Sequence, residues 1–156
     1  MGIFAKGKDV PKGVVDMQLV GGVLSTQQVV GTSCSMMVAM RSAGYHSKPH
    51  VHDCEQLNYV SRGEIWVFVE DDAFELKMGD FLRIPPSKVH WAWNRADQDC
   101  ELIECHSPGL DILPEDQAVF LLSDKEDRRS VRRVGTTFPE GNFVEVETKI
   151  LKKKTN

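Results

Sequence analysis

The sequence predicts an all-β fold in a single domain, and three observations support this. The chain has 156 residues, a length that one hydrophobic core serves. Hydrophobic residues make up 41% of it and charged residues 27%, which is typical of a folded domain. From about residue 14 to residue 106, short runs of β-branched and aromatic residues alternate with turn residues. Many short strands at regular spacing indicate a β-sandwich or a barrel.

Each expected strand ends near a turn signal, because glycine and proline interrupt extended runs. Gly21-Gly22 follows the first run, Gly63 separates two central runs, and Pro85-Pro86 precedes the eighth. We expect an N-terminal arm over residues 1–13 and a barrel over residues 14–107. The expected strands are 14–20, 23–30, 33–40, 56–61, 64–69, 73–77, 81–84, 89–93 and 100–105.

The character of the sequence changes at Pro108, where the regular strand pattern stops. Residues 114–122 predict a short helix that begins with Pro114. The mixed charges of residues 123–133 favour a solvated loop over a phosphate-binding role. Residues 142–151 resemble a late strand, followed by a lysine-rich tail. We therefore expect residues 108–156 to pack on the barrel or on a partner subunit.

Charge and composition disfavour several classes of protein. A net charge of -4 argues against general nucleic-acid binding. No apolar run approaches the ~18–20 residues of a membrane span, and the first residues contain no signal-peptide core. Four cysteines without a Cys-x-x-Cys pair indicate free thiols in a reducing cytoplasm; they are Cys34, Cys54, Cys100 and Cys105. We expect a cytoplasmic protein whose partners are a small-molecule substrate and a second copy of itself.

Three of the five histidines occur in an informative context. His50 and His52 are two residues apart, so both rings face the same side of a strand. Gln56 follows at the same parity, and His90 comes from a distant strand after Pro85-Pro86. Imidazoles that converge from two strands form a good metal site, because neutral imidazole nitrogen suits Zn, Cu, Fe and Ni.

Glycine, proline and asparagine residues recur at fixed distances from these histidines. The first group, with the histidine pair in it, is Gly44, His50, His52, Gln56 and Gly63. The second group is Gly79, Pro85, Ser87, His90 and Asn94. In identity and spacing the two groups resemble the two motifs of the cupin superfamily, over about residues 40–106. The resemblance implies a cupin-type double-stranded β-helix (a jelly-roll barrel) with a short C-terminal helix and tail. It also implies one divalent transition metal ion (Ni, Zn, Mn or Fe) on His50, His52, Gln56 and His90.

Two positions depart from the cupin pattern. Ser87 replaces a turn glycine, which a negative φ at this residue would tolerate. Gln56 stands where the family usually has Glu, and a neutral amide leaves the ion its full formal charge. The ion would then be a stronger Lewis acid but more weakly held. If a bulge displaced the strand, Glu55 would become the fourth ligand instead. A degenerate cupin with packed histidines and no metal is the alternative to the whole site.

The three-His-plus-Gln set resembles the small pectin-degradation cupins, which open or isomerise an unsaturated uronate ring. That resemblance extends to Glu104-Cys105-His106-Ser107-Pro108, where Glu104 matches an acidic residue and His106 an aromatic one. The Arg that the family has shortly after this proline is absent from Gly109-Leu110-Asp111. The resemblance therefore supports the chemistry of the site more than the substrate.

Glu104 and His106 are the candidate catalytic residues. They share one face of the last expected strand, and an apolar lumen would raise the pKa of Glu104 toward the value that a proton carrier needs. Alternatively Glu104 pairs with an Arg, and His106 is a structural histidine. We expect His46 at the surface or rim, Asn58 beside the pocket, and Trp91 and Trp93 facing away from the metal.

Three functions fit this set of residues. The first is a metal-dependent isomerase, cyclase or lyase that acts on a small carbonyl or sugar-acid-like substrate by Lewis-acid polarisation and proton transfer. The second is an iron-dependent dioxygenase, because three histidines hold Fe(II) with open positions. The third is a non-enzymatic module that binds a small molecule. A homodimer that exchanges strands within residues 14–31 is compatible with each of them.

Overall fold

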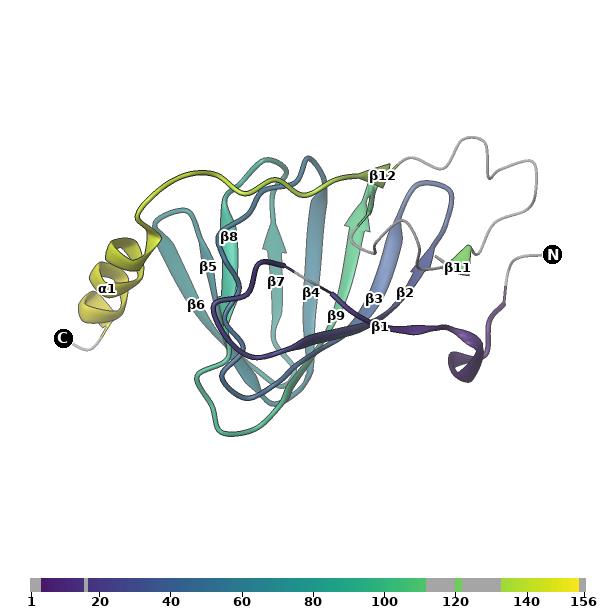
Figure 1. Cartoon of the computed structure of the whole chain (residues 1–156), viewed down its shortest axis with the longest axis horizontal. Helices are drawn as coiled ribbons and strands as arrows, with labels where there is room; N and C mark the ends of the chain where they lie inside the picture. Colours follow the sequence, from purple (N-terminus) through teal and green to yellow (C-terminus); the bar gives the residue numbers. More distant parts are fainter. Residues whose placement is uncertain (1–3, 16, 112–119, 122–132, 155–156) are drawn as a thin grey trace.

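Short strands make up most of the regular secondary structure in the described part of the chain (Figure 1). In the strands over residues 24–30 and 35–41, buried side chains alternate with more exposed ones. The computed structural model describes residues 4–15, 17–111, 120–121 and 133–154. The strands up to β6 are β1 (Lys12–Val14), β2 (Leu24–Val30), β3 (Ser35–Arg41), β4 (Glu55–Arg62), β5 (Glu64–Val69) and β6 (Asp72–Lys77). The later strands are β7 (Phe81–Ile84), β8 (His90–Trp93), β9 (Cys100–Ser107), β10 (Gly109–Leu110), β11 (Phe120–Leu121) and β12 (Arg133–Val134). A 3₁₀ turn, η1 (Gly7–Asp9), and a helix, α1 (Phe143–Lys154), complete the described elements.

The strands expected from residue 23 to residue 105 are confirmed, with ends that agree to within two residues. The strand expected over residues 14–20 is wrong, because β1 ends at Val14. Gln18 adopts a left-handed φ of 49°, which extended backbone does not tolerate. Val15 and Met17 are instead buried in the core, so this segment leaves the sheet to cover it.

Two antiparallel sheets build the barrel and confirm the jelly-roll fold class. The larger sheet has the order β1-β2-β3-β9-β4-β7, with β11 parallel to β2, and the smaller one has the order β6-β5-β8. β10 and β12 form a separate parallel pair. Within the larger sheet β9 lies between β3 and β4, as Figure 1 shows. Its register pairs Glu104 with Met37 and His106 with Gln56, so residues far apart in the sequence meet on one face.

The main core lies between the two sheets. Period-two alternation places one face of each strand toward the opposite sheet, where apolar side chains exclude water. The cluster includes Met37, Ala39, Val60 and Leu102 from the larger sheet and Ile65, Val67, Leu76 and Ala92 from the smaller sheet. Burial of this kind contributes about 25 cal/mol per Å² of apolar surface removed from water.

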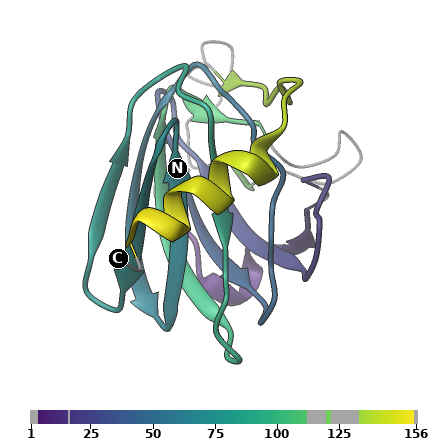
Figure 2. The ribbon, with the colours of Figure 1, turned by 90° about the vertical axis from the view of Figure 1, so that its left-hand side faces the viewer.

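The segment expected as a late strand, residues 142–151, is a helix, which corrects that prediction. Its β-branched residues suggested extended backbone, but Phe143, Val146 and Ile150 recur at helical spacing on one face. This face packs against Phe68 and Trp91 in a second apolar cluster. Figure 2 shows α1 crossing in front of the strands of the smaller sheet.

Other expectations for the C-terminal part are only partly covered by the structure. The expected helix over 114–122 and the charged segment 123–133 lie mostly outside the described residues, although Phe120–Leu121 forms a strand and not a helical end. β1 begins at Lys12, so pairing with β2 starts two residues before the predicted barrel boundary. The described part of the chain includes no helix with the length and hydrophobicity needed to span a bilayer.

Two glycines allow a direct test of the packing beside the site. Gly22 and Gly44 have similar left-handed φ angles of 71° and 72°. A Cβ on Gly22 would lie 2.4 Å from the Tyr45 Cα, whereas one on Gly44 would meet nothing within 4 Å. We expect Gly44→Ala to cost about 1–2 kcal/mol of unfolding free energy, and Gly22→Ala roughly 1–3 kcal/mol more. Urea unfolding measures both values, and equal losses would contradict the close approach of residues 22 and 45.

Candidate metal centre

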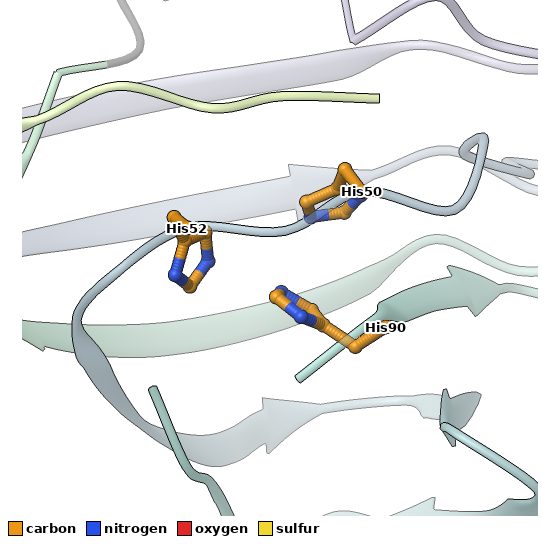
Figure 3. Close-up of side chains that lie close together, drawn as sticks. All are labelled: His50, His52 and His90. Carbon is orange, nitrogen blue, oxygen red and sulfur yellow. The ribbon is translucent and has the colours of Figure 1, made fainter. Parts of the chain in front are cut away.

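Three histidines from two separate segments converge inside the barrel. The potential ligand atoms of His50, His52 and His90 all lie within 4.8 Å of one another. Figure 3 shows the rings of His52 and His90 pointing toward one another, with His50 beside them. His52 and His90 are buried as whole residues, and in His50, which is half-buried as a residue, the potential ligand atom is buried like those of the other two. The convergence expected from the sequence is therefore present in the fold.

Backbone hydrogen bonds fix the positions of His50 and His90. Each residue donates its N–H to the carbonyl of the other, at 3.0 and 2.9 Å. The ring Nδ1 of His50 lies 2.9 Å from the Lys48 carbonyl, and that of His90 lies 2.8 Å from the Lys88 carbonyl. Because a carbonyl only accepts, Nδ1 carries the proton and the lone pair of Nε2 is left for a metal. Among the described residues, none hydrogen-bonds to the buried Nε2 of His90.

Gln56, and not Glu55, points toward the histidines. The Gln56 Oε1 lies 3.1 Å from the Nε2 of His52, and its amide nitrogen donates to Asn58 Oδ1 at 2.7 Å. Asn58 is buried and lines the same cavity, as expected. Glu55 lies on the opposite face of β4, where Arg83 donates to it at 2.6 Å. Inward and outward side chains therefore alternate normally at Glu55 and Gln56, without the bulge that would exchange them.

Burial keeps the three imidazoles neutral. Removal from water disfavours the charged form, so burial lowers the pKa of His50 to about 4. The pKa of His90 falls well below its ordinary value, first through burial and then through the neighbouring histidines. Burial also lowers the pKa of His52. Neutral imidazoles are the form that binds a metal ion, so the donor set fits a divalent transition metal.

Glu104 and Arg41 form a buried ion pair, which corrects the expected pKa of Glu104. Burial alone raises the pKa of this carboxyl, but the positive charge of Arg41 and its hydrogen bond lower it below the ordinary value. The Nη2 of Arg41 donates to Oε1 of Glu104, and both side chains are buried. Of the two roles considered for Glu104, pairing with an Arg is the one that the structure contains.

His106 lies in the same interior. It is 1% exposed, and its Nε2 is 3.9 Å from Glu104 Oε2, beyond hydrogen-bond distance. Within the described part of the chain, neither ring nitrogen of His106 has a hydrogen-bond partner. Its ring centre is 5.6 Å from that of His52. Burial lowers the pKa of His106 to about 4, so it is neutral at pH 7.

One narrow cavity joins all these groups. About 40 Å³ of it is open to the centre of a water molecule. The polar residues in its wall are Arg41, Tyr45, Ser47, His50, His52, Gln56, Asn58, His90, Glu104 and His106. Apolar residues, among them Met17, Met37 and Leu102, form the rest. The cavity therefore combines a cluster of neutral imidazoles with a buried ion pair, in a wall that is about half polar and half apolar.

Two residues near the site have surroundings that the sequence does not show. Ser87 has a φ of 61° and not a negative one, so it keeps the glycine-like turn. Hydrogen bonds from its N–H to the His52 carbonyl at 3.0 Å and from its hydroxyl to Asp53 at 3.1 Å hold it there. His46 does not lie at a free rim, because its Nε2 is 2.7 Å from Glu147 of α1 and its ring stacks on Trp93.

The tryptophan Trp91 faces away from the histidines, as its parity predicts. Its indole is 1% exposed, stacks on Phe68 and donates to Glu147 at 2.6 Å. Arg41, in contrast, is a cavity residue that the sequence interpretation missed. The sequence could have identified it, because Arg41 follows Met37 and Ala39 at even spacing on the same strand and therefore lies on their buried face. A charged residue at an inward position of a strand indicates a polar partner inside the barrel.

The fold and this donor set together define a small β-barrel with a three-histidine cluster of the kind that can hold a metal ion. Residues 36–106 match the family model described as a cupin domain. Residues 36–106 thus form a cupin domain. No curated protein is significantly similar to it in sequence.

Solved structures of other cupins share its architecture. An RmlC-like cupin from Shewanella frigidimarina is 26% identical, with a TM-score of 0.56, over 72% of this chain and 93% of that one. A sugar phosphate isomerase of the cupin superfamily from Silicibacter pomeroyi is 13% identical, with a TM-score of 0.56, over 67% and 74% of the two chains. AerE from Microcystis aeruginosa is 21% identical, with a TM-score of 0.56, over 67% and 46%. The last two similarities concern the fold alone.

The buried histidines make the stability of the metal-free protein depend on pH. His106 has a folded pKa of about 4 against about 6.5 when unfolded, so the unfolded chain binds more protons between these values. Stability is therefore fully present above pH 6.5 and is lost as the pH falls toward 4. From His106 alone we expect a loss of roughly 2 kcal/mol between pH 7 and pH 5. Urea unfolding after chelation measures the loss.

The variant His106→Gln serves as the comparison for this measurement. It removes one titrating group, so the dependence of its unfolding free energy on pH should be shallower than that of the wild type. The same slope in both proteins would contradict a neutral, buried His106.

Proposed function

We propose that this protein is a metal-dependent cupin enzyme of the isomerase, cyclase or lyase type. His50, His52, His90 and Gln56 hold one divalent ion, either nickel, zinc, manganese or iron. The substrate is a small oxygenated molecule with a carbonyl or hydroxyl group. The observation that carries the proposal is the convergence of three neutral imidazoles on a cavity whose wall also includes His106.

The charge of the ligand set is important for this chemistry. A bound divalent ion would act as a Lewis acid on a substrate oxygen. Gln56 supplies an amide oxygen and no charge, and its contact with Asn58 fixes the direction of that oxygen. Likewise, the hydrogen bonds from the Nδ1 atoms of His50 and His90 to backbone carbonyls fix the orientation of each ring.

We assign proton transfer to His106. Both of its ring nitrogens lack a hydrogen-bond partner within the described chain, and the residue lines the cavity, so one nitrogen can exchange a proton with a substrate there. Glu104, the other candidate catalytic residue, is engaged by Arg41 and lies 3.9 Å from His106. We propose that Glu104 acts as a charged neighbour that positions Arg41 and His106.

Location and assembly complete the proposal. All four cysteines are free, which supports the cytoplasm as the site of action.

We propose a homodimer formed through residues 14–31, because Val14, Val20 and Val23 of this segment are exposed. Sedimentation of the wild type and of a Val20→Asp variant tests this assembly, and an unchanged dimer in the variant would contradict it.

Loss of one histidine should empty the metal site. We expect His52→Ala to lower bound metal from about one ion per chain to less than about a tenth, because two imidazoles and one amide bind too weakly. Elemental analysis of the purified protein measures the ratio. The matched control is His46→Gln, which changes a histidine that contacts Glu147 and not the cavity. Full metal content in His52→Ala would contradict the ligand assignment.

The nature of the metal and of the turnover separates the proposal from its alternatives. Turnover without oxygen uptake supports the isomerase, cyclase or lyase. Iron together with oxygen consumption on a dicarbonyl or catechol would identify a dioxygenase instead. Metal or ligand binding without any turnover would identify a non-enzymatic module.

A charged fourth ligand should bind the ion more tightly. We expect Gln56→Glu to lower the dissociation constant for zinc by about tenfold or more, because a carboxylate neutralises part of the charge of the ion. Competition with a chromophoric chelator measures this constant. Glu55→Gln is the matched control, since Glu55 lies outside the barrel beside Arg83. A change in the control but not in Gln56→Glu would make Glu55 the ligand.

A further inference from the structure

We propose that Arg41 forms a carboxylate-binding subsite in the metal-site cavity, so that the substrate is a small organic acid. Arg41 is the last residue of β3 and is 7% exposed. Its Nη2 donates to Glu104, but its Nε and Nη1 have no hydrogen-bond partner within the described chain. The inference deepens the proposed function and rests on it.

The unpartnered nitrogens are the main argument. Arg carries five N–H groups, and Nε and Nη1 hold three of them. These donors are removed from water and have no hydrogen-bond partner among the described residues, which is unfavourable unless another group accepts their hydrogen bonds. A carboxylate oxygen is the acceptor that matches a guanidinium best in charge and geometry.

The charge of the cavity wall also favours an anion. The charges of Arg41 and Glu104 cancel one another. Gln56 adds no charge to the ligand set. With a divalent ion on the histidines, the wall carries two uncompensated positive charges, and a substrate carboxylate reduces this excess.

The size of the cavity limits the acid to a few heavy atoms. A water molecule needs about 10–15 Å³ of such volume, and about 40 Å³ is present. Molecules the size of acetate, glycolate or oxalate fit this limit.

Tyr45 helps to hold the guanidinium of Arg41 in place. The centre of its ring lies 5.3 Å from the Cζ of Arg41, which is a cation–π contact.

The experiment compares an acid with its uncharged counterpart. Glycolate and glycolamide have nearly the same shape, so their relative affinity reports the carboxylate alone. Saturation-transfer NMR on the ligand signals measures both dissociation constants for the zinc-loaded and the metal-free wild-type protein. We expect glycolate to bind at least tenfold more tightly than glycolamide in both forms. Equal affinities in the wild type would overturn the subsite without any variant.

A double variant then assigns the preference to Arg41. Arg41→Met with Glu104→Gln removes both buried charges together, so neither partner is left unpaired. We expect the preference for glycolate to be lost in the metal-free form of this variant. Arg83→Met is the matched control, because it removes a half-exposed Arg from the outer face of the larger sheet. The control should keep the preference.

The outcomes separate the subsite from the proposed function. A preference seen only with zinc, and kept by the double variant, would overturn the subsite and leave the metal site intact. A preference in the metal-free wild type, combined with failure to bind any divalent ion, would support the subsite and overturn the proposed metal-dependent function.

Discussion

Two reciprocal backbone hydrogen bonds between His50 and His90 hold the candidate metal centre together. They join the segment before β4 to the start of β8, and each ring is then oriented by the carbonyl two residues before it. The orientations of the His50 and His90 rings thus depend in part on main-chain geometry. A site built in this way is rigid before a ligand arrives, which reduces the entropy that binding must overcome.

The second organising constraint is the buried ion pair between Arg41 and Glu104. Arg41 comes from β3 and Glu104 from β9, which are neighbours in the larger sheet. Burying two charges is costly, and their mutual attraction offsets that cost only when the geometry is good. The pair therefore contributes more to the electrostatic character of the cavity than to stability.

Most of the barrel was predictable from the sequence because period-two alternation is a local property. The convergence of His50, His52 and His90 was predictable from their spacing and from the family resemblance. Three features needed tertiary information. Residues 142–151 form a helix because Phe68 and Trp91 present an apolar surface to one of its faces. The pKa of Glu104 falls because Arg41 arrives from another strand. His46 is covered by Glu147, which lies 101 positions further along the chain.

The contact of α1 with the smaller sheet has a consequence during protein synthesis. Glu147 bonds to both His46 and Trp91, and Ile150 is buried against Phe68, so the helix covers the outer side of β5 and β8. This helix leaves the ribosome after all the strands that it covers. Until then the nascent chain displays Phe68 and Trp91 to its surroundings, an interval in which chaperones or neighbouring chains compete for the same apolar surface.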